Sequence, residues 1–431
     1  MARGAPIHAG TLRRQMALAD YLVAFRSRKI ALLLALGFSS GLPLALTAGT
    51  LQAWLASENV DIVAIGWFAL VGQPYTYKFL WAPLMDRYAL PVFGRRRGWL
   101  LATQLALAAA IAFMGTLRPT DSAWLLGSTA LAVAFLSASQ DIVFDALRAD
   151  WLEREERGAG AAVSVLGYRL AMLASGAGAL ILADQWLGWR ATYWLMAALM
   201  GVGMLATWLV VEPEPKGGVP RTLNEAVAQP FAEFLSRQGA LALLALVVLY
   251  KLGDAFAGNL TTAFLLRGPG FSLTEIGAIN KGFGLAATIV GALAGGALMA
   301  KMRLYRALLL FGALQAVTNL GFMLLAGAGK SYALMIAVIG LENLCGGMGT
   351  AAYVALLMAL CDRRFSATQY ALLSALSAVG RVYVGPAAGY MVEAMGWEAF
   401  FFATFLIALP GLALLVWMRA RVDALDRPTA S

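Results

Sequence analysis

The sequence predicts an all-α membrane protein with twelve transmembrane helices, arranged as two pseudo-symmetric six-helix bundles. Hydrophobic residues make up 61% of the 431 residues and charged residues only 13%, whereas a soluble domain is about half apolar and a quarter charged. Many stretches reach the roughly 20 apolar residues that one membrane span requires. The second half of the chain also resembles the first half.

Short polar breaks separate the predicted spans, and only one break is long. We place the spans at 30–56, 62–84, 98–117, 122–147, 159–184, 192–211, 240–266, 275–299, 307–328, 331–360, 367–393 and 399–418. The long break contains Glu-Pro-Glu-Pro-Lys-Gly-Gly, which cannot continue a helix, and its later part, 223–235, is amphipathic. The predicted organisation is a tail, a six-helix bundle, a linker, a second six-helix bundle and a short tail, at 1–29, 30–211, 212–239, 240–418 and 419–431.

Lysine and arginine are distributed unequally between the two sides of the predicted membrane. The tails, the linker and the loops on their side carry 24 of these residues, and the opposite loops carry 4, namely Arg118, Arg190, Arg267 and Lys330. Because cytoplasmic segments are enriched in Lys and Arg, both tails and the linker are predicted to be cytoplasmic. The net charge of +9 is therefore a topology signal. It indicates a lipid bilayer and no nucleic-acid partner. The first 29 residues are polar, so we expect no cleaved signal peptide.

Several features recur at an offset of 211 or 212 residues. The matching pairs are 60–66 with 271–277, Gln104 with Gln315, and Arg169 with Arg381. Each of the two arginines precedes a glycine-rich helix and then a Gly-Trp dipeptide. Parallel repeats of six spans, related by an axis along the membrane normal, are typical of one large class of secondary transporters.

Specific motifs carry a resemblance to a known family. Met85-Asp-Arg-Tyr88, followed by Phe93-Gly-Arg-Arg-Arg-Gly-Trp99, resembles the loop between spans two and three of major facilitator proteins. Stretches from span one to span eleven, such as Ser-Ala-Ser-Gln-Asp-Ile-Val-Phe-Asp-Ala in span four, resemble the AmpG-type muropeptide permeases. The resembling stretches are 37–54, 78–88, 137–146, 156–162, 164–170, 250–256, 342–350, 365–369 and 374–386.

The resemblance implies a major facilitator fold and a proton-driven permease of the bacterial inner membrane. Its substrates would be N-acetylglucosaminyl-1,6-anhydro-N-acetylmuramyl peptides, imported from the periplasm during cell-wall recycling. Some family members continue with two further C-terminal spans, whereas this sequence has only a short charged tail after Met418. We expect that difference to affect regulation or stability more than transport. The alternative is the same fold carrying another large anionic solute, such as an acyl-CoA-like molecule.

Nine ionisable residues fall inside predicted spans, where a charge is costly unless it faces a cavity or a partner. They are Lys78, Asp141, Asp145, Arg169, Lys251, Asp254, Lys281, Glu342 and Arg381. Because these residues are spread over seven spans, they favour a central translocation path over a catalytic set at one membrane face. We therefore predict that the protein is not an enzyme.

Helical spacing pairs some of these charges. Asp141 and Asp145 share one face of span four, and Arg148 follows three residues later. Asp145 therefore either forms an intrahelical ion pair with that arginine or serves the path, while Asp141 lies deeper. Lys251 and Asp254, three residues apart, either neutralise each other or bind substrate and exchange a proton.

The remaining charges also leave two interpretations open. Glu342, beside Asn343, is either a structural partner of Arg381 or Lys281 or a functional acid. Arg169 and Arg381 occupy equivalent places in the two halves. They are either structural residues or hold substrate carboxylates, which arginine binds in a bidentate manner.

Amide and aromatic side chains in the first two spans suit sugar hydroxyls and apolar ring faces. Joined to the charged candidates, they give the predicted substrate-binding set: Gln52, Gln73, Tyr75, Gln140, Asp141, Arg169, Lys251, Lys281, Asn343 and Arg381. Trp54 is predicted in the outer aromatic belt instead.

Proton coupling has to use a carboxylate. The only histidine, His8, lies in the N-terminal tail, which excludes a histidine relay across the membrane. Burial favours the neutral form of a carboxyl group and a nearby cation favours its charged form, so a coupling acid alternates between these conditions. We rank the candidates Asp254, Glu342 and then Asp141. The predicted driving force is the proton gradient, with no cofactor.

The sequence contains no motif for metal binding, nucleophilic catalysis or ATP hydrolysis. Cys345 and Cys361 have neither metal-ligand spacing nor the pattern of a disulfide framework. Gly329-Lys-Ser331 lacks the additional glycine of a phosphate-binding loop, because Leu324 occupies that position. We infer no obligate protein partner from the sequence.

Overall fold

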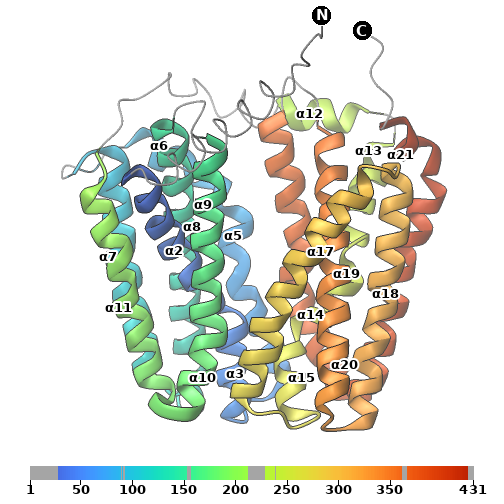
Figure 1. The fold of residues 1–431 in the computed structure, drawn as a ribbon, viewed down its shortest axis with the longest axis horizontal. Coiled ribbons are helices and arrows are strands. Elements are labelled where there is room, and N and C mark those ends of the chain that lie inside the picture. The colour runs from blue at the N-terminus through green and yellow to red at the C-terminus, as the bar shows by residue number, and fades with distance from the viewer. Residues whose placement is uncertain are drawn as a thin grey trace, which may run out of the picture.

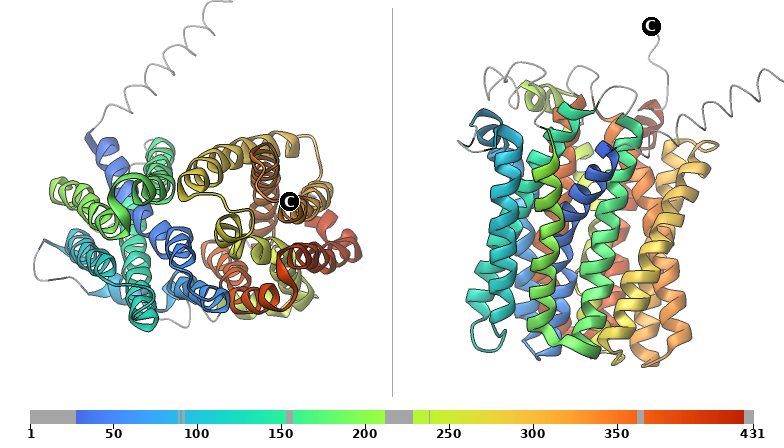
Figure 2. Two further views of the ribbon diagram at one scale, coloured as in Figure 1. Left: turned by 90° about the horizontal axis from the view of Figure 1, so that it is seen from below. Right: turned by 60° about the vertical axis from the view of Figure 1, so that its left-hand side comes forward.

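The computed structural model describes residues 28–88, 90, 93–152, 157–211, 229–237, 239–361 and 366–425. The described residues form helices joined by short turns, and they include no strand. Figure 1 shows two groups of helices side by side, with the N-terminal half in blue and green and the C-terminal half in yellow to red. Seen along the bundle in Figure 2, the groups remain separate over most of their width.

Among the described residues, ten α-helices lie before residues 212–228 and ten lie after them. Those of the N-terminal half are α2 (Arg28–Thr47), α3 (Gly49–Ser57), α4 (Ile62–Trp67), α5 (Gln73–Tyr77), α6 (Ala82–Arg87), α7 (Arg95–Thr116), α8 (Ala123–Trp151), α9 (Arg157–Met172), α10 (Ala179–Leu182) and α11 (Gly188–Leu209). Those of the C-terminal half are α12 (Gln229–Ser236), α13 (Ala240–Leu249), α14 (Leu252–Asn259), α15 (Thr261–Arg267), α16 (Leu273–Glu275), α17 (Gly284–Met299), α18 (Leu304–Ala328), α19 (Tyr332–Ala359), α20 (Ser366–Trp417) and α21 (Arg419–Leu425).

Nine helical stretches of the described chain are long and apolar enough to cross a membrane. Helices suit this environment because they satisfy their backbone hydrogen bonds internally. Two of the stretches, 162–209 and 373–417, are 48 and 45 residues long, about twice the length of one crossing. In each, a glycine with positive φ turns the chain, Gly188 at 66° and Gly396 at 75°, so each stretch folds into a hairpin.

The segment predicted as span two is not one continuous helix. It consists of α4, α5 and α6 joined by two short 3-10 turns. Pro74 lies in the first turn of α5 and Pro83 in that of α6, where proline is tolerated but removes a backbone donor that would continue the preceding helix. The predicted count of twelve spans therefore depends on this broken segment and on the two hairpins.

Glycines bring pairs of long helices close together inside each half. A Cβ atom on Gly37 of α2 would overlap the Ser164 carbonyl of α9. In the C-terminal half, a Cβ atom on Gly291 of α17 would likewise overlap the Leu344 carbonyl of α19. Small residues at helix contacts are typical of membrane proteins because they allow backbones to approach closely.

The two halves touch at the end of the bundle opposite the start of α2, which we call the sealed end. There α3 packs on α15, and α4 crosses α20. Gly66 of α4 faces the Gly385 carbonyl of α20, and Gly389 faces the backbone of Val63. Figure 1 shows the two groups of helices converging at this lower end. The cavity between the halves is therefore closed on this side.

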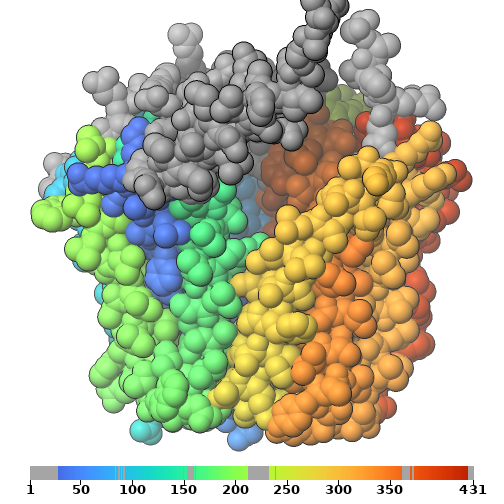
Figure 3. Space-filling model, viewed as in Figure 1, coloured from blue at the N-terminus to red at the C-terminus, as the bar shows by residue number. Residues whose placement is uncertain are grey.

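At the opposite end, which we call the open end, the halves part. In Figure 3 the surface is hollowed between α9 and α17 at this end. The linker helix α12 lies here against the C-terminal half, since Arg237 ion-pairs with Glu233 at 2.7 Å and donates to the Leu360 carbonyl at 2.5 Å. Of the predicted linker 212–239, residues 212–228 and 238 lie outside the described chain. So do residues 1–27 of the predicted tail 1–29 and residues 426–431 of the predicted tail 419–431.

Candidate functional site

A charged network lies in the C-terminal half, where the helix breaks between α13 and α14. Lys251, at this break, places its ammonium 3.1 Å from Asp254 Oδ2 and 2.9 Å from Gln315 Oε1. The first contact confirms the predicted pair. The second joins α18 to the network, so the lysine is held from two helices.

Glu342 of α19 lies beside this network. Its charged neighbours are Asp254, Lys251 and Lys281. Within the described chain, no ion pair of 4.0 Å or less joins Glu342 to Lys281 or to Arg381, the two partners suggested by the sequence. The acid therefore faces two lysines without being locked to either.

Lys281 reaches from the C-terminal half into the N-terminal half. Its ammonium donates to the Thr262 hydroxyl at 2.9 Å. A Cβ atom on Gly49 would lie 2.9 Å from the same ammonium, and one on Gly176 would touch the Lys281 stem. The two glycines of the N-terminal half thus leave the space that this side chain occupies.

The repeated arginines, one from each half, both act electrostatically on one tyrosine. Tyr168 of α9 is an electrostatic neighbour of Arg169 on its own helix and of Arg381 on α20. Arg381 is exposed and Arg169 half-buried. Within the described residues, neither guanidinium has a carboxylate within 4.0 Å. One positive charge from each half therefore acts on Tyr168, and neither is neutralised by a carboxylate of the described chain.

The acidic residues of α8 have different surroundings. Asp145 pairs with Arg148 at 3.0 Å near the open end, which is the intrahelical ion pair that the spacing allowed. Asp141, one turn deeper, accepts a hydrogen bond from the Ser40 hydroxyl of α2. Its nearest opposite charge belongs to Lys78.

Three of the predicted binding amides already have partners. Gln140 is 1% exposed and donates to Ser39 Oγ at 3.3 Å. Asn343 donates to the Ile339 carbonyl at 2.9 Å and accepts from Thr288 at 2.9 Å. These two amides therefore tie helices together inside one half, whereas Gln73, at the start of α5, is half-buried.

Gln52 is the third occupied amide, and it joins the two halves. Its Nε2 donates to the Asn259 carbonyl at 2.5 Å, and its Oε1 accepts from the Ala263 backbone N–H at 3.3 Å. The chain breaks at Leu260 before α15, so this N–H has no partner in its own helix. In the present state Gln52 therefore closes the sealed end.

The prediction that Trp54 belongs to an outer aromatic belt is wrong. Its side chain is 3% exposed and stacks on Trp189 at 5.7 Å between ring centroids. Trp189 donates to the Ser57 hydroxyl at 3.0 Å. The three residues pack inside the N-terminal half, since α3 turns this face inward.

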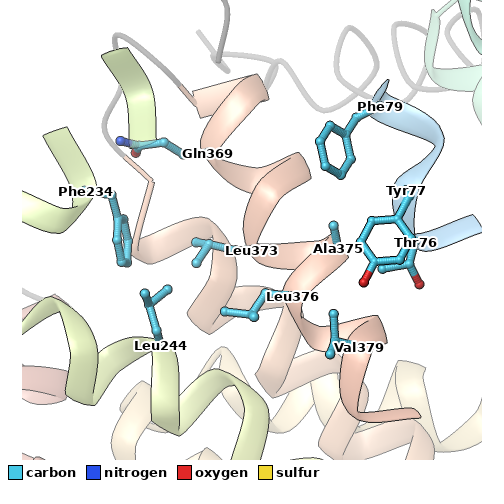
Figure 4. Close-up of a pocket in the computed structure, with 10 residues that line it drawn as sticks. All are labelled: Thr76, Tyr77, Phe79, Phe234, Leu244, Gln369, Leu373, Ala375, Leu376 and Val379. Atoms are coloured by element: carbon cyan, nitrogen blue, oxygen red, sulfur yellow. The ribbon is translucent and has the colours of Figure 1, made fainter. Parts of the chain in front are cut away.

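An apolar recess of about 230 Å³ lies between the halves near the open end. Figure 4 shows its lining residues, in which Tyr77 and Phe79 stand opposite side chains of α20. The lining comprises Thr76, Tyr77, Phe79, Phe234, Leu244, Gln369, Leu373, Ala375, Leu376 and Val379. The wall near the open end is thus apolar, in contrast to the cations deeper between the halves.

The described part of the chain contains no cluster of metal-ligating side chains. No group of three or more His, Cys, Asp or Glu residues is placed there to hold a metal ion.

The geometry consists of two helix bundles that meet at one end and have charged side chains between them. The model of the Major Facilitator Superfamily matches residues 30–382. The chain belongs to this superfamily.

Curated relatives place the chain within a group of the Major Facilitator Superfamily. It is 59% identical over 404 residues to the anhydromuropeptide permease of Escherichia coli (strain K12), covering 94% of this chain and 82% of that one. It is 34% identical to the putative transporter AmpG 4 of Rickettsia felis, covering 93% and 98% of the two chains. The chain is thus a membrane transport protein of the AmpG type and not an enzyme.

Solved structures share the fold at low sequence identity. A bacterial homologue of the human lysosomal transporter Spinster, crystallised in an inward-facing and unoccupied conformation, has a TM-score of 0.68 at 17% identity, covering 96% of this chain and 99% of that one. A peptide transporter of the POT family in complex with sulfate has a TM-score of 0.68 at 15% identity, covering 92% and 95%. These matches support the major facilitator fold alone.

Several contacts of this major facilitator protein were missed by reasoning from the sequence. Tyr168 was not singled out, although it stands beside both arginines. Arg267 was counted only as a loop charge, yet it donates to the Ala56 carbonyl at 3.0 Å and the Leu55 carbonyl at 3.3 Å. The repeat offset was the available clue, because Ala56 and Arg267 are 211 residues apart, as are Gln52 and Ala263.

Proposed function

We propose that the protein is a secondary active transporter that imports anhydromuropeptides from the periplasm to the cytoplasm by alternating access. Support comes from the 59% identity to an anhydromuropeptide permease. The structural observation that most supports this function is a set of cations between the halves. Arg169, Arg381 and Lys281 have no carboxylate partner within 4.0 Å in the described chain. The peptide stem of such a substrate carries several carboxylates that these cations would bind.

The substrate would span both halves. Arg169 is on the N-terminal side, Arg381 and Lys281 are on the C-terminal side, and Lys281 crosses the boundary. We propose that Arg169 and Arg381 clamp the peptide carboxylates, since guanidinium groups bind carboxylates in a bidentate manner. Gln73 and the apolar recess at Tyr77 would face the sugars. Gln52 would join them only when the sealed end opens.

We propose twelve spans in the inner membrane, with both termini and the linker in the cytoplasm. The 24-to-4 distribution of Lys and Arg supports this orientation. In that orientation the open end faces the cytoplasm and the sealed end faces the periplasm. A reporter enzyme fused after Ala430 should show cytoplasmic activity, and a periplasmic readout would overturn the orientation and the span count together.

We propose further that transport is driven by the proton gradient. The candidate coupling acids are Asp254, Glu342 and Asp141, and no cofactor is required. A coupling residue, replaced by its neutral amide, should lose accumulation against a gradient while it retains counterflow exchange. Asp254→Asn and Glu342→Gln are the direct tests. If both variants still accumulate substrate under a pH gradient, Asp141 or another driving ion is indicated.

Uptake into proteoliposomes tests the function itself. Purified protein should accumulate radiolabelled N-acetylglucosaminyl-1,6-anhydro-N-acetylmuramyl tripeptide, faster when the lumen is alkaline relative to the medium. Unlabelled anhydromuropeptide should compete, and an acyl-CoA should not. Empty liposomes are the control for leakage. Competition by the acyl-CoA without competition by the muropeptide would assign the protein to another anionic solute.

A further inference from the structure

A cluster of buried polar side chains lies inside the N-terminal half, apart from the cations between the halves. Ser40 of α2 donates a hydrogen bond to Asp141 of α8. Ser137 precedes Asp141 by four residues and so lies on the same face of α8. The Tyr75 hydroxyl of α5 is beside the Ser137 hydroxyl and near the Asp141 carboxylate. Three helices therefore bring three hydroxyls and one carboxylate together.

Two of these hydroxyls have no partner in the protein. Tyr75 Oη and Ser137 Oγ are enclosed and make no hydrogen bond, and the whole Ser137 side chain is 1% exposed. A buried polar group left without a partner costs about 1–3 kcal/mol, and native proteins meet this need with ordered water. Each hydroxyl can donate and accept, so together with Asp141 they supply the two to four partners that a buried water requires.

The surroundings of Asp141 differ from those of Asp254. Asp254 is held by the Lys251 ammonium, which is itself fixed by Gln315, so protonation of Asp254 would break an ion pair. Asp141 has a neutral hydroxyl donor, Ser40, and no ion pair within 4.0 Å in the described chain. Protonation of Asp141 would break no ion pair of 4.0 Å or less, and a neighbouring hydroxyl can accept the hydrogen bond that the protonated carboxyl group would donate.

The charges around Asp141 come from several elements. Two charged side chains act directly on the Asp141 carboxylate: Lys78, which follows α5, and Asp145 on α8. Asp145 is itself paired with Arg148. The α9 side contributes Tyr168, which interacts electrostatically with Asp141. On α7, Arg95 and Arg96 ion-pair with Asp150 at 3.9 and 3.1 Å. Asp86 and Arg87 of α6 have side chains outside the described part. Lys78 is therefore the cation that remains to balance the Asp141 carboxylate.

We propose that this cluster binds ordered water and that Asp141, hydrated by it, is the group that takes up the transported proton. Tyr75 and Ser137 are positioning residues, because they hold the water that carries the proton to the carboxylate. The proposal rests on the proposed proton-driven function and assigns its coupling site to the N-terminal half. It leaves Asp254 as a structural ion pair of the C-terminal half.

Infrared difference spectroscopy on proteoliposomes, without substrate, tests this site directly. Titration of the unsubstituted protein should show a protonated-carboxyl band that Asp141→Asn removes, and water bands that shift in H₂¹⁸O. The double variant Tyr75→Phe/Ser137→Ala should lose those water bands and change the pH midpoint of the carboxyl band. Matched controls are Asp145→Asn, an exposed acid on the same helix, and Ser128→Ala, whose hydroxyl already donates to the Leu125 carbonyl.

Two results would overturn the proposal. One is a carboxyl band that persists in Asp141→Asn. The other is a double variant that keeps the water bands and the pH midpoint of the carboxyl band. A transport measurement runs beside the infrared titration. Asp141→Asn should accumulate no more substrate with a pH gradient than without one, whereas Asp145→Asn, on the same helix, should keep the dependence on the gradient. If the unsubstituted protein transports no anhydromuropeptide, the proposed substrate is wrong, but the infrared result still decides whether the proton site exists.

Discussion

The two halves place side chains of different chemistry at equivalent positions. Gln104 and Gln315 are 211 residues apart, and so are Ser40 and Lys251. In the N-terminal half, Gln104 Oε1 accepts from the Thr207 hydroxyl at 2.8 Å. In the C-terminal half, Gln315 Oε1 accepts from the Lys251 ammonium at 2.9 Å. The first hydrogen bond joins two neutral groups, and the second joins a neutral amide to a charged ammonium.

This difference shows which features of a contact are set by the repeated helix arrangement and which are set by the individual side chains. The shared helix arrangement determines where a polar group points into its half, and the individual side chain determines whether the contact carries charge. At these positions the N-terminal half depends on a neutral hydrogen bond. Its ion pairs lie elsewhere, joining Asp145 to Arg148 and Asp150 to Arg96. The C-terminal half depends on a charged network in which the loss of one member leaves another uncompensated.

The largest effect is expected when the charged network is broken. Lys251→Ala leaves the Asp254 carboxylate, whose side chain is 19% exposed, without its cation. An unpaired buried charge costs about 3–5 kcal/mol, so the melting temperature of the purified protein should fall sharply. The double variant Lys251→Ala/Asp254→Ala should recover most of the loss. If the single variant melts like the unsubstituted protein, the network does not stabilise the C-terminal half.

The next effect concerns the repeated arginines. Arg169→Ala or Arg381→Ala should raise the apparent KM for anhydromuropeptide about 10- to 100-fold, because each removes a charged hydrogen bond of about 1.5–3 kcal/mol. The rate at saturation should change less. Arg190→Ala, at an arginine in the first turn of α11 that lies over Trp194, is the matched control. An unchanged KM at normal expression would remove the arginines from the binding site, and loss of folding would indicate a structural role.

A smaller effect is expected at the sealed end, where the halves meet through equivalent positions. Gln52→Ala removes the acceptor of the Ala263 N–H, and Arg267→Ala removes the donor to Ala56. Each unsatisfied group costs about 1–3 kcal/mol, which should favour opening of this end. A cysteine placed at Ala53, in a background without native cysteines, should react several-fold faster with an impermeant maleimide. Equal rates in the variants and the parent would show that these bonds do not hold the seal.

The smallest effect is expected in the neutral network. Thr207→Val removes the hydroxyl that Gln104 accepts from, while it preserves the shape of the side chain. A neutral hydrogen bond contributes about 0.5–1.5 kcal/mol, so the melting temperature should fall only slightly. A loss as large as that of Lys251→Ala would contradict the contrast between the two halves.

Short-range features were predictable from the sequence. The order of the helices and the two hairpins follow from apolar stretches separated by polar breaks and Gly-Trp turns. The pairs Lys251–Asp254 and Asp145–Arg148 follow from helical spacing, because residues three apart share one helix face. The break in the second span was not predicted, although Pro74 gave a signal for it.

Contacts between distant helices were not predictable, because they depend on how each helix is rotated about its axis. Ser40 and Asp141 are 101 residues apart, and no pattern in either segment indicates their hydrogen bond. For the same reason Gln140 and Asn343, chosen as polar groups of central spans, are engaged inside one half. Trp54 was assigned to the membrane surface, and the packing of α3 on Trp189 buries it.

Distances between spin labels at the two ends of the bundle test alternating access for anhydromuropeptides most directly. One pair, Arg118→Cys with Lys330→Cys, spans the sealed end, and the other, Phe93→Cys with Lys301→Cys, spans the open end; all four positions are exposed. Saturating N-acetylglucosaminyl-1,6-anhydro-N-acetylmuramyl tripeptide should lengthen the first distance and shorten the second in part of the molecules. An acyl-CoA should change neither. If the muropeptide leaves both distributions unchanged, or moves both ends in the same direction, the account is contradicted.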